Sequence, residues 1–177
     1  MPGAATALVT FAEFEQMPDV EGFRLELHDG EVVQVPPPKL GHSIIQHNLL
    51  NELKVAFGPD VFVGLEVGFR AGDRTYLVPD VVAVPRQRFR SFPRDGYIVG
   101  APEIVIEVLS PSNTVSEMNA KEQLCLENGT LEFWVIDPER RQVKISTSDG
   151  RFTVYKSGQT IALRFGGNLA VDSVFAD

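Results

Sequence analysis

Two carboxylates and one amine occupy positions from which they could act together on a substrate. Glu107 interrupts the apolar, β-branched run at 104–109, which has the composition of a strand buried on both faces. A buried strand seldom tolerates a lone charge, because desolvation is costly unless a partner compensates. Lys121 follows on a helix predicted over about 114–128. The sequence therefore predicts an acid on a buried strand and an amine on the helix after it.

Asp80 is the predicted partner of Glu107, because it precedes the apolar strand segment 81–84. Two carboxylates at one sheet edge suit Mg²⁺ (or Mn²⁺), with water and substrate phosphate filling the other positions. Lys121 would then orient or help deprotonate the attacking water, or stabilise charge on the phosphate. The alternative is that Asp80 is an ordinary strand-end residue and that Glu107 pairs with a lysine or arginine.

The surrounding pattern predicts an α/β protein, in the α/β to α+β range, with a mixed twisted β-sheet flanked by helices. Residues 1–177 are expected to form a single domain. Asp29-Gly30 predicts an N-terminal hairpin. The other expected elements are a short helix from Thr10 to about Met17, hairpin strands at 23–27 and 31–35, a helix at 42–57, strands at 61–70, 75–84, 103–109 and 131–136, and a C-terminal antiparallel meander from 142 onward.

The composition favours a soluble globular protein in a reducing compartment. The chain is 44% hydrophobic and 23% charged, which is typical of soluble globular proteins. Its single cysteine excludes an internal disulfide, so a reducing cytoplasm is the expected location. The N-terminus does not resemble a signal peptide, and no apolar run approaches the roughly 20 residues that span a membrane.

The charge distribution gives evidence both for and against nucleic-acid binding. The net charge of −8 counts against a general nucleic-acid binder. Residues 70–100 nevertheless carry six basic and three acidic groups. Arginines can grip phosphate, so this segment is a candidate nucleic-acid contact, and the alternative is a solvated loop that offsets an acidic protein. The arginines concerned are Arg86, Arg88, Arg90 and Arg94.

Several short motifs occur together in the first 140 residues. They are Leu25-Glu26-Leu27-His28-Asp29-Gly30-Glu31, His42 at the start of the first long helix, Glu66-Val67-Gly68-Phe69, Pro79-Asp80-Val81, the segment 106–112, Lys121, and the segment 132–138. In this order they resemble the PD-(D/E)xK nuclease superfamily, whose fold is that of many type II restriction endonucleases. More specifically, they resemble the prokaryotic "putative restriction endonuclease" family that is abundant in cyanobacteria.

The resemblance implies a restriction-endonuclease-like fold and Mg²⁺- or Mn²⁺-dependent endonucleolytic hydrolysis of DNA. It implies Asp80, Glu107 and the Val108 carbonyl as metal ligands, with Lys121 as the catalytic amine. The superfamily's lysine normally lies two residues after the motif acid, where this chain has Leu109. The resemblance therefore assigns that role to the helix. The family pattern also has Asp four residues before this lysine and Tyr four after it, where this chain has Glu117 and Cys125.

Four further residues match the pattern with less definite roles. Glu66 is interpreted as a water-mediated ligand or an exposed strand acid. Glu26 and His42 are interpreted as local hydrogen-bonding groups, and Glu117 preserves a negative charge. A catalytically inactive protein that binds nucleic acid or a protein partner is the alternative function. A structural module, in which an arginine would hold Glu107, is a third. A homodimer is expected, because restriction-type nucleases commonly dimerise to cut both strands.

Overall fold

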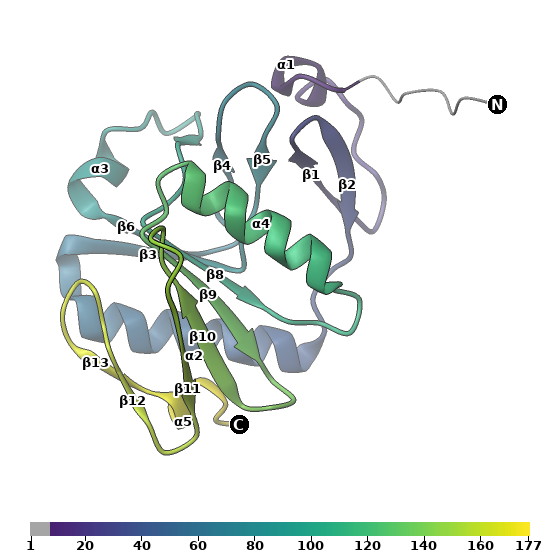
Figure 1. The fold of residues 1–177 in the computed structure, drawn as a ribbon. Coiled ribbons are helices and arrows are strands. Elements are labelled where there is room, and N and C mark those ends of the chain that lie inside the picture. The colour runs from purple at the N-terminus through teal and green to yellow at the C-terminus, as the bar shows by residue number, and fades with distance from the viewer. Residues whose placement is uncertain (1–7) are drawn as a thin grey trace.

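A six-stranded mixed sheet forms the centre of the computed structural model, which describes residues 8–177 (Figure 1). Within this sheet, β8 (Ile104–Val108) and β9 (Glu132–Asp137) pair in parallel, and the other neighbours pair antiparallel. In spatial order the strands are β11 (Phe152–Lys156), β10 (Gln142–Ser146), β9 (Glu132–Asp137), β8 (Ile104–Val108), β6 (Val81–Pro85) and β3 (Val61–Leu65).

One helix covers each face of this sheet. Helix α4 (Val115–Glu127) is the crossover that the parallel β8–β9 pair requires, and in Figure 1 it crosses in front of the strands while α2 (Leu40–Phe57) lies behind. Alternate residues of β8 follow this division. Ile104 and Ile106 pack in the cluster that contains α2, whereas Val105 packs in the cluster that contains α4. Because strand side chains alternate, Glu107 belongs to the α4 face.

The N-terminal hairpin is confirmed, and it joins a second sheet that sequence periodicity does not predict. Asp29 and Gly30 both have positive φ, as a tight hairpin turn requires. Leu27 pairs with Tyr76 and links the hairpin to the rest of this sheet. Its strands, in spatial order, are β2 (Glu31–Val35), β1 (Arg24–His28), β5 (Tyr76–Leu77), β4 (Phe69–Arg70) and β7 (Ile98–Val99).

Two expected long strands are each broken, so the predictions at 61–70 and 75–84 are wrong as continuous elements. The first breaks after β3, where Glu66 adopts a left-handed backbone conformation with φ of 50°. The second breaks at Pro79-Asp80, between β5 and β6. In each case the two halves belong to different sheets. Glu66 and Asp80 therefore lie where the chain passes from one sheet to the other.

The arginine-rich loop and the C-terminal meander also differ from expectation. Residues expected as a loop include the short helix α3 (Arg86–Arg90). In the tail, β10 and β11 extend the central sheet, but β12 (Thr160–Ala162) and β13 (Asn168–Ala170) form a separate pair. Helix α5 (Val171–Val174) follows them and packs in the core cluster on the α2 side. The meander is thus divided between two sheets.

Capping boxes begin two helices. In α1 (Phe11–Phe14), Thr10 and Glu13 cap each other's backbone N–H groups, although the helix ends earlier than the expected Met17. Thr114 and Glu117 form the same arrangement at the start of α4. A single 3₁₀ turn, η1 (Gly58–Asp60), links α2 to β3. Among the helices of residues 8–177, none combines the length and apolar character needed to cross a bilayer.

Candidate active site

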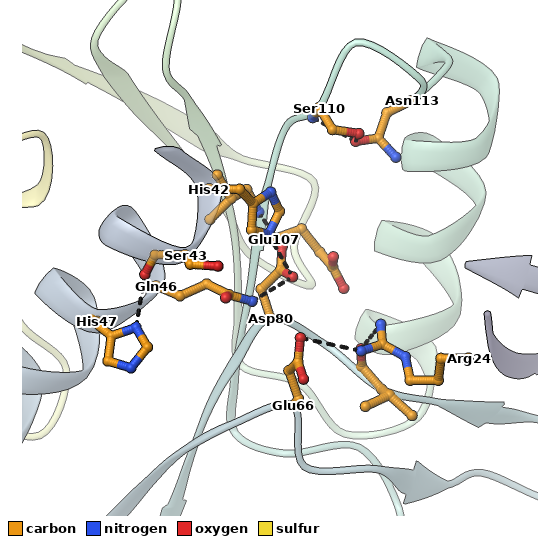
Figure 2. Close-up of polar contacts among 12 residues, drawn as sticks. Arg24, His42, Ser43, Gln46, His47, Glu66, Asp80, Glu107, Ser110 and Asn113 are labelled. Atoms are coloured by element: carbon orange, nitrogen blue, oxygen red, sulfur yellow. Dashed lines mark hydrogen bonds and ion pairs between the residues drawn. The ribbon is translucent and has the colours of Figure 1, made fainter. Parts of the chain in front are cut away.

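Strand register places Asp80 across from Glu107. Val81 of β6 pairs with Ile106 of β8, so the residue before β6 lies opposite the residue after Ile106. The two acids are buried, with 8% and 7% of their surfaces exposed. Figure 2 shows both carboxylates between the N-terminal part of α2 and helix α4. The predicted juxtaposition of two acids at one sheet edge is therefore present.

Asp80 is fixed by three hydrogen bonds from two elements. Its Oδ1 lies 2.9 Å from His42 Nε2 and accepts a 3.0 Å bond from Gln46 Nε2 (Figure 2). Its Oδ2 accepts a 2.7 Å bond from the Val108 backbone N–H. His42 and Gln46 are one turn apart on α2 and so face the same side. His42 thus acts over a distance of 38 residues, not locally, and Gln46 is a site residue that sequence reasoning missed.

Lys121 reaches the same edge from α4. The buried residues Met118 and Cys125 define the inward face of that helix, and Lys121 lies between them at helical spacing. Its side chain is only 12% exposed. Its Nζ lies 2.7 Å from Glu107 Oε1 and 3.5 Å from Glu26 Oε2. The structure therefore brings Asp80, Glu107 and Lys121 together, and Glu107 is held by a lysine and not by an arginine.

Two pKa values are shifted upward at this contact, that of Glu107 mainly by burial and that of Lys121 by the neighbouring acids. Burial raises the pKa of Glu107 to about 8, assisted by the charges of Asp80 and Glu26 and opposed by Lys121. Burial alone would lower the pKa of Lys121, but Glu107 and Glu26 raise it above its usual value. The Lys121 amine thus lies among three acids, Glu107, Glu26 and Asp80. When Glu107 is ionised, these acids carry more negative charge than the one amine neutralises, and the excess favours a cation.

Glu26 is the most enclosed of these acids, at 1% exposure. Its Oε1 accepts 3.2 Å bonds from Arg24 and from the Val78 backbone N–H, and its Oε2 lies 2.8 Å from His28 Nε2. Burial would raise its pKa, yet the charges of Lys121, His28 and Arg24 lower the pKa to about 2. The sequence interpretation limited Glu26 to local hydrogen bonds, and its contact with Lys121 was missed.

Comparisons with known proteins show the family of this chain. A family model named Uma2 and described as "Putative restriction endonuclease" matches residues 11–175. The chain belongs to this family. A crystal structure of a "putative nuclease belonging to DUF820" from Anabaena variabilis ATCC 29413 is similar, with a TM-score of 0.82, 25% identity, and coverage of 94% of this chain and 97% of that one. No curated protein matches the chain.

The resemblance drawn from the sequence motifs and the restriction-endonuclease-like fold are thereby confirmed. The Uma2 family match spans both sheets and both major helices, including every residue of the edge described above. Neither comparison assigns roles to individual side chains.

Two family-pattern positions on α4 have structural roles. Glu117 accepts bonds of 2.9 Å and 2.8 Å from the backbone N–H and hydroxyl of Thr114, and these bonds lower its pKa. It is exposed and caps the helix that carries Lys121. Cys125 is fully buried, and burial raises the pKa of its thiol. The small thiol therefore serves as core packing beneath the lysine in this Uma2-family chain.

Glu66 lies at the rim of the site. Its side chain is 42% exposed, and Oε1 is 3.5 Å from a guanidinium nitrogen of Arg24 (Figure 2). Its backbone N–H donates to the Asp80 carbonyl oxygen at 3.1 Å. Left-handed backbone at a non-glycine residue is uncommon and often marks a functional position. Arg24 connects this rim acid to Glu26 inside.

Two of the four candidate arginines are committed to the protein itself. Arg86 donates to the carbonyl oxygens of Pro59 and Val61. Arg88 pairs with Glu103 at 2.8 Å and also donates to three backbone carbonyls. Their guanidinium groups hold α3 and its neighbours in place. Phosphate contact therefore stays a prediction that depends mainly on Arg90 and Arg94.

The edge fits a divalent cation held partly by water and substrate. Glu107 Oε1 is buried, and within residues 8–177 the ion pair with the Lys121 amine at 2.7 Å is its only polar contact. Asp80 and Glu107 supply hard oxygen donors, as Mg²⁺ prefers. Within residues 8–177, no three or more His, Cys, Asp or Glu side chains cluster as a metal cage. A two-carboxylate site completed by water and phosphate remains consistent with this finding.

Proposed function

We propose that this chain is an endonuclease that hydrolyses phosphodiester bonds of DNA with Mg²⁺ or Mn²⁺. The observation that carries the proposal is the convergence of Asp80, Glu107 and Lys121 at one sheet edge, with the amine 2.7 Å from Glu107. The family description and the crystal structure named above, both of nuclease type, support the same reading.

Asp80 and Glu107 would hold the cation, with the Val108 carbonyl as a third ligand, and the bound cation would polarise the phosphate. Lys121 is charged, because the surrounding acids raise its pKa. A charged amine stabilises negative charge that develops on the phosphate oxygens, which is its role in this proposal. His42 and Gln46 keep the Asp80 carboxylate in position through their bonds to Oδ1.

A plasmid-nicking assay with Mg²⁺, Mn²⁺ or EDTA tests the proposal. Asp80→Asn should reduce cleavage by about 100- to 1,000-fold, because it removes one of the two charged ligands. The matched control is Glu132→Gln. Glu132 is a partly buried, ion-paired acid at the opposite end of the sheet, where it contacts Arg164 and Trp134. Equal cleavage by wild type and Asp80→Asn would remove the proposal.

A second outcome would indicate the alternative function. Arg86 and Arg88 are engaged within the protein and the net charge is −8, and both observations weaken a large DNA contact. DNA binding that survives Lys121→Ala, with no turnover under either metal, would indicate a nuclease-fold protein that binds without cutting.

A further inference from the structure

The amine of Lys121 lies between two acids that come from different sheets. Glu107 belongs to β8 of the central sheet, and Glu26 belongs to β1 of the N-terminal sheet. The amine is 2.7 Å from the first and 3.5 Å from the second. All three side chains are at most 12% exposed. The short contact is thus with the proposed metal ligand, and a longer gap remains on the other side.

The two oxygens of Glu26 make different kinds of contact. Oε1 accepts from Arg24 and from the backbone N–H of Val78, two residues before Asp80. This oxygen therefore fixes the chain that leads into the site. Oε2 faces His28 and the Lys121 amine. A carboxylate oxygen accepts more than one bond, so Oε2 has capacity for the ammonium in addition to His28.

A cation at Glu107 would change the position of lowest energy for the amine. A carboxylate that binds a divalent ion has its charge neutralised, and the ion repels a neighbouring ammonium. The contact of 2.7 Å would weaken, and a buried ammonium needs another anion nearby. Glu26 is the other acid in contact with Lys121 among the described residues. Arg24 and Val78 hold Glu26 in place, so it does not have to move.

We infer that Glu26 is a positioning residue that holds the Lys121 amine in the site while Glu107 binds the divalent cation. The inference rests on the proposed function, since it assigns Glu107 to the cation. It makes the N-terminal hairpin a part of the active site. It also separates the two buried glutamates by role: Glu107 exchanges partners, whereas Glu26 keeps the lysine.

A crystal of the wild-type protein soaked with Mn²⁺ tests the inference without any substitution. Lys121 Nζ should move to hydrogen-bond distance from Glu26 Oε2 and should lie farther from Glu107 than the present 2.7 Å. An amine that stays on Glu107, or that turns to solvent, overturns the inference while leaving the metal site intact. A crystal in which Asp80 and Glu107 hold no Mn²⁺ overturns the proposed metal chemistry itself.

Glu26→Gln supplies a solution test. The amide oxygen can replace Oε1 toward Val78, but the amide nitrogen cannot attract the ammonium. With Mn²⁺ affinity retained, kcat for plasmid nicking should fall by about 10- to 100-fold at unchanged KM, the range for residues that orient an active-site group. Glu132→Gln is again the control and should match wild type.

A spectroscopic signature distinguishes positioning from a general loss of structure. The chain has five lysines, so ¹³Cε-lysine NMR is simple to assign, with Lys121→Arg identifying the Lys121 signal. With Mg²⁺ bound, the Lys121 signal should report an immobile side chain in wild type and a mobile side chain in Glu26→Gln. A folded Glu26→Gln protein with wild-type kcat and an immobile Lys121 overturns the inference. If this variant does not fold, the Mn²⁺ crystal decides.

Discussion

Lys121 lies between two buried glutamates whose hydrogen bonds and pKa values differ. On the β1 side, Glu26 accepts bonds from Arg24 and Val78 and lies beside His28, and its pKa is lowered to about 2. On the β8 side, Glu107 has the Lys121 ion pair as its only polar contact within residues 8–177, and burial raises its pKa to about 8. Burial is nearly the same for both.

This difference indicates that one acid has a structural role and that the other can bind a metal ion. A carboxylate with several donors is stabilised as an anion and fixes its surroundings. A buried carboxylate with few hydrogen-bond donors is destabilised as an anion until it binds a cation or a proton. Glu107 therefore has the properties expected of a metal ligand, and Glu26 has those of a support.

Glu107→Gln is expected to have the largest effect on cleavage, a loss of about 100- to 1,000-fold. Its effect on stability has the opposite sign. Burial raises the pKa of Glu107 in the native protein to about 8, against about 4.3 in the unfolded chain. Metal-free wild type therefore loses stability as pH rises through this window, and Glu107→Gln does not.

Urea unfolding in EDTA at about pH 5 and about pH 9 measures this difference. The free energy of unfolding of the variant should increase relative to that of wild type as the pH rises, because the substitution removes the group whose native pKa is raised. A wild-type protein whose stability rises across this window would show that Lys121 compensates Glu107 fully, and the contrast with Glu26 would disappear.

Glu26→Gln should lower the free energy of unfolding by roughly 3 kcal/mol near pH 7, from a pKa of about 2 against about 4.3 unfolded. Because the native pKa is depressed, this stabilisation is present above about pH 4.3 and is lost as pH falls toward 2. Chemical denaturation near pH 7 and near pH 3 should therefore show the deficit shrinking in acid. An equal deficit at both pH values would assign the effect to packing instead of charge.

Much of the site was predictable because its main elements have strong local patterns. An acid inside an apolar run identified Glu107, and an acid before such a run identified Asp80. The helix after β8 was predictable because Asn113 or Thr114 could cap its start, and Thr114 is the cap in the structure. Lys121 then follows from helical spacing.

The hairpin strand β1 was predicted, but its position beside Lys121 was not, because the strands that connect β1 to the rest of its sheet are very short. β4, β5 and β7 have two residues each, too few to show a period of two. Without them, nothing in the sequence brings Glu26 near α4. Gln46 was hidden for another reason, because a single amide in an amphipathic helix has no distinctive pattern. The break at Glu66 depends on a left-handed backbone that sequence rules assign to glycine.

Thr114→Ala tests the helix that links the two glutamates. Loss of the cap at α4 should cost about 1 kcal/mol of unfolding free energy, and cleavage should stay within about threefold because Lys121 lies two turns further on. Thr10→Ala is the matched control, since Thr10 forms the same capping box at α1. A much larger loss of cleavage for Thr114→Ala alone would make the start of α4 part of the site.

Glu66→Gln should have the smallest effect and sets the outer limit of the charged network. Glu66 is 42% exposed and its contact with Arg24 is 3.5 Å, so the pair should contribute less than about 0.5 kcal/mol. Arg24 keeps its bonds to Glu26 and to the Val78 carbonyl in this variant, so the β1 side should stay intact. Cleavage within about threefold of wild type, at unchanged Mn²⁺ affinity, is the expected result. A loss beyond about tenfold with weaker Mn²⁺ binding would instead favour the first of the two sequence interpretations of Glu66, a water-mediated ligand. Three carboxylates would then share the cation, and Glu107 would no longer be distinguished from its neighbours by lack of donors alone.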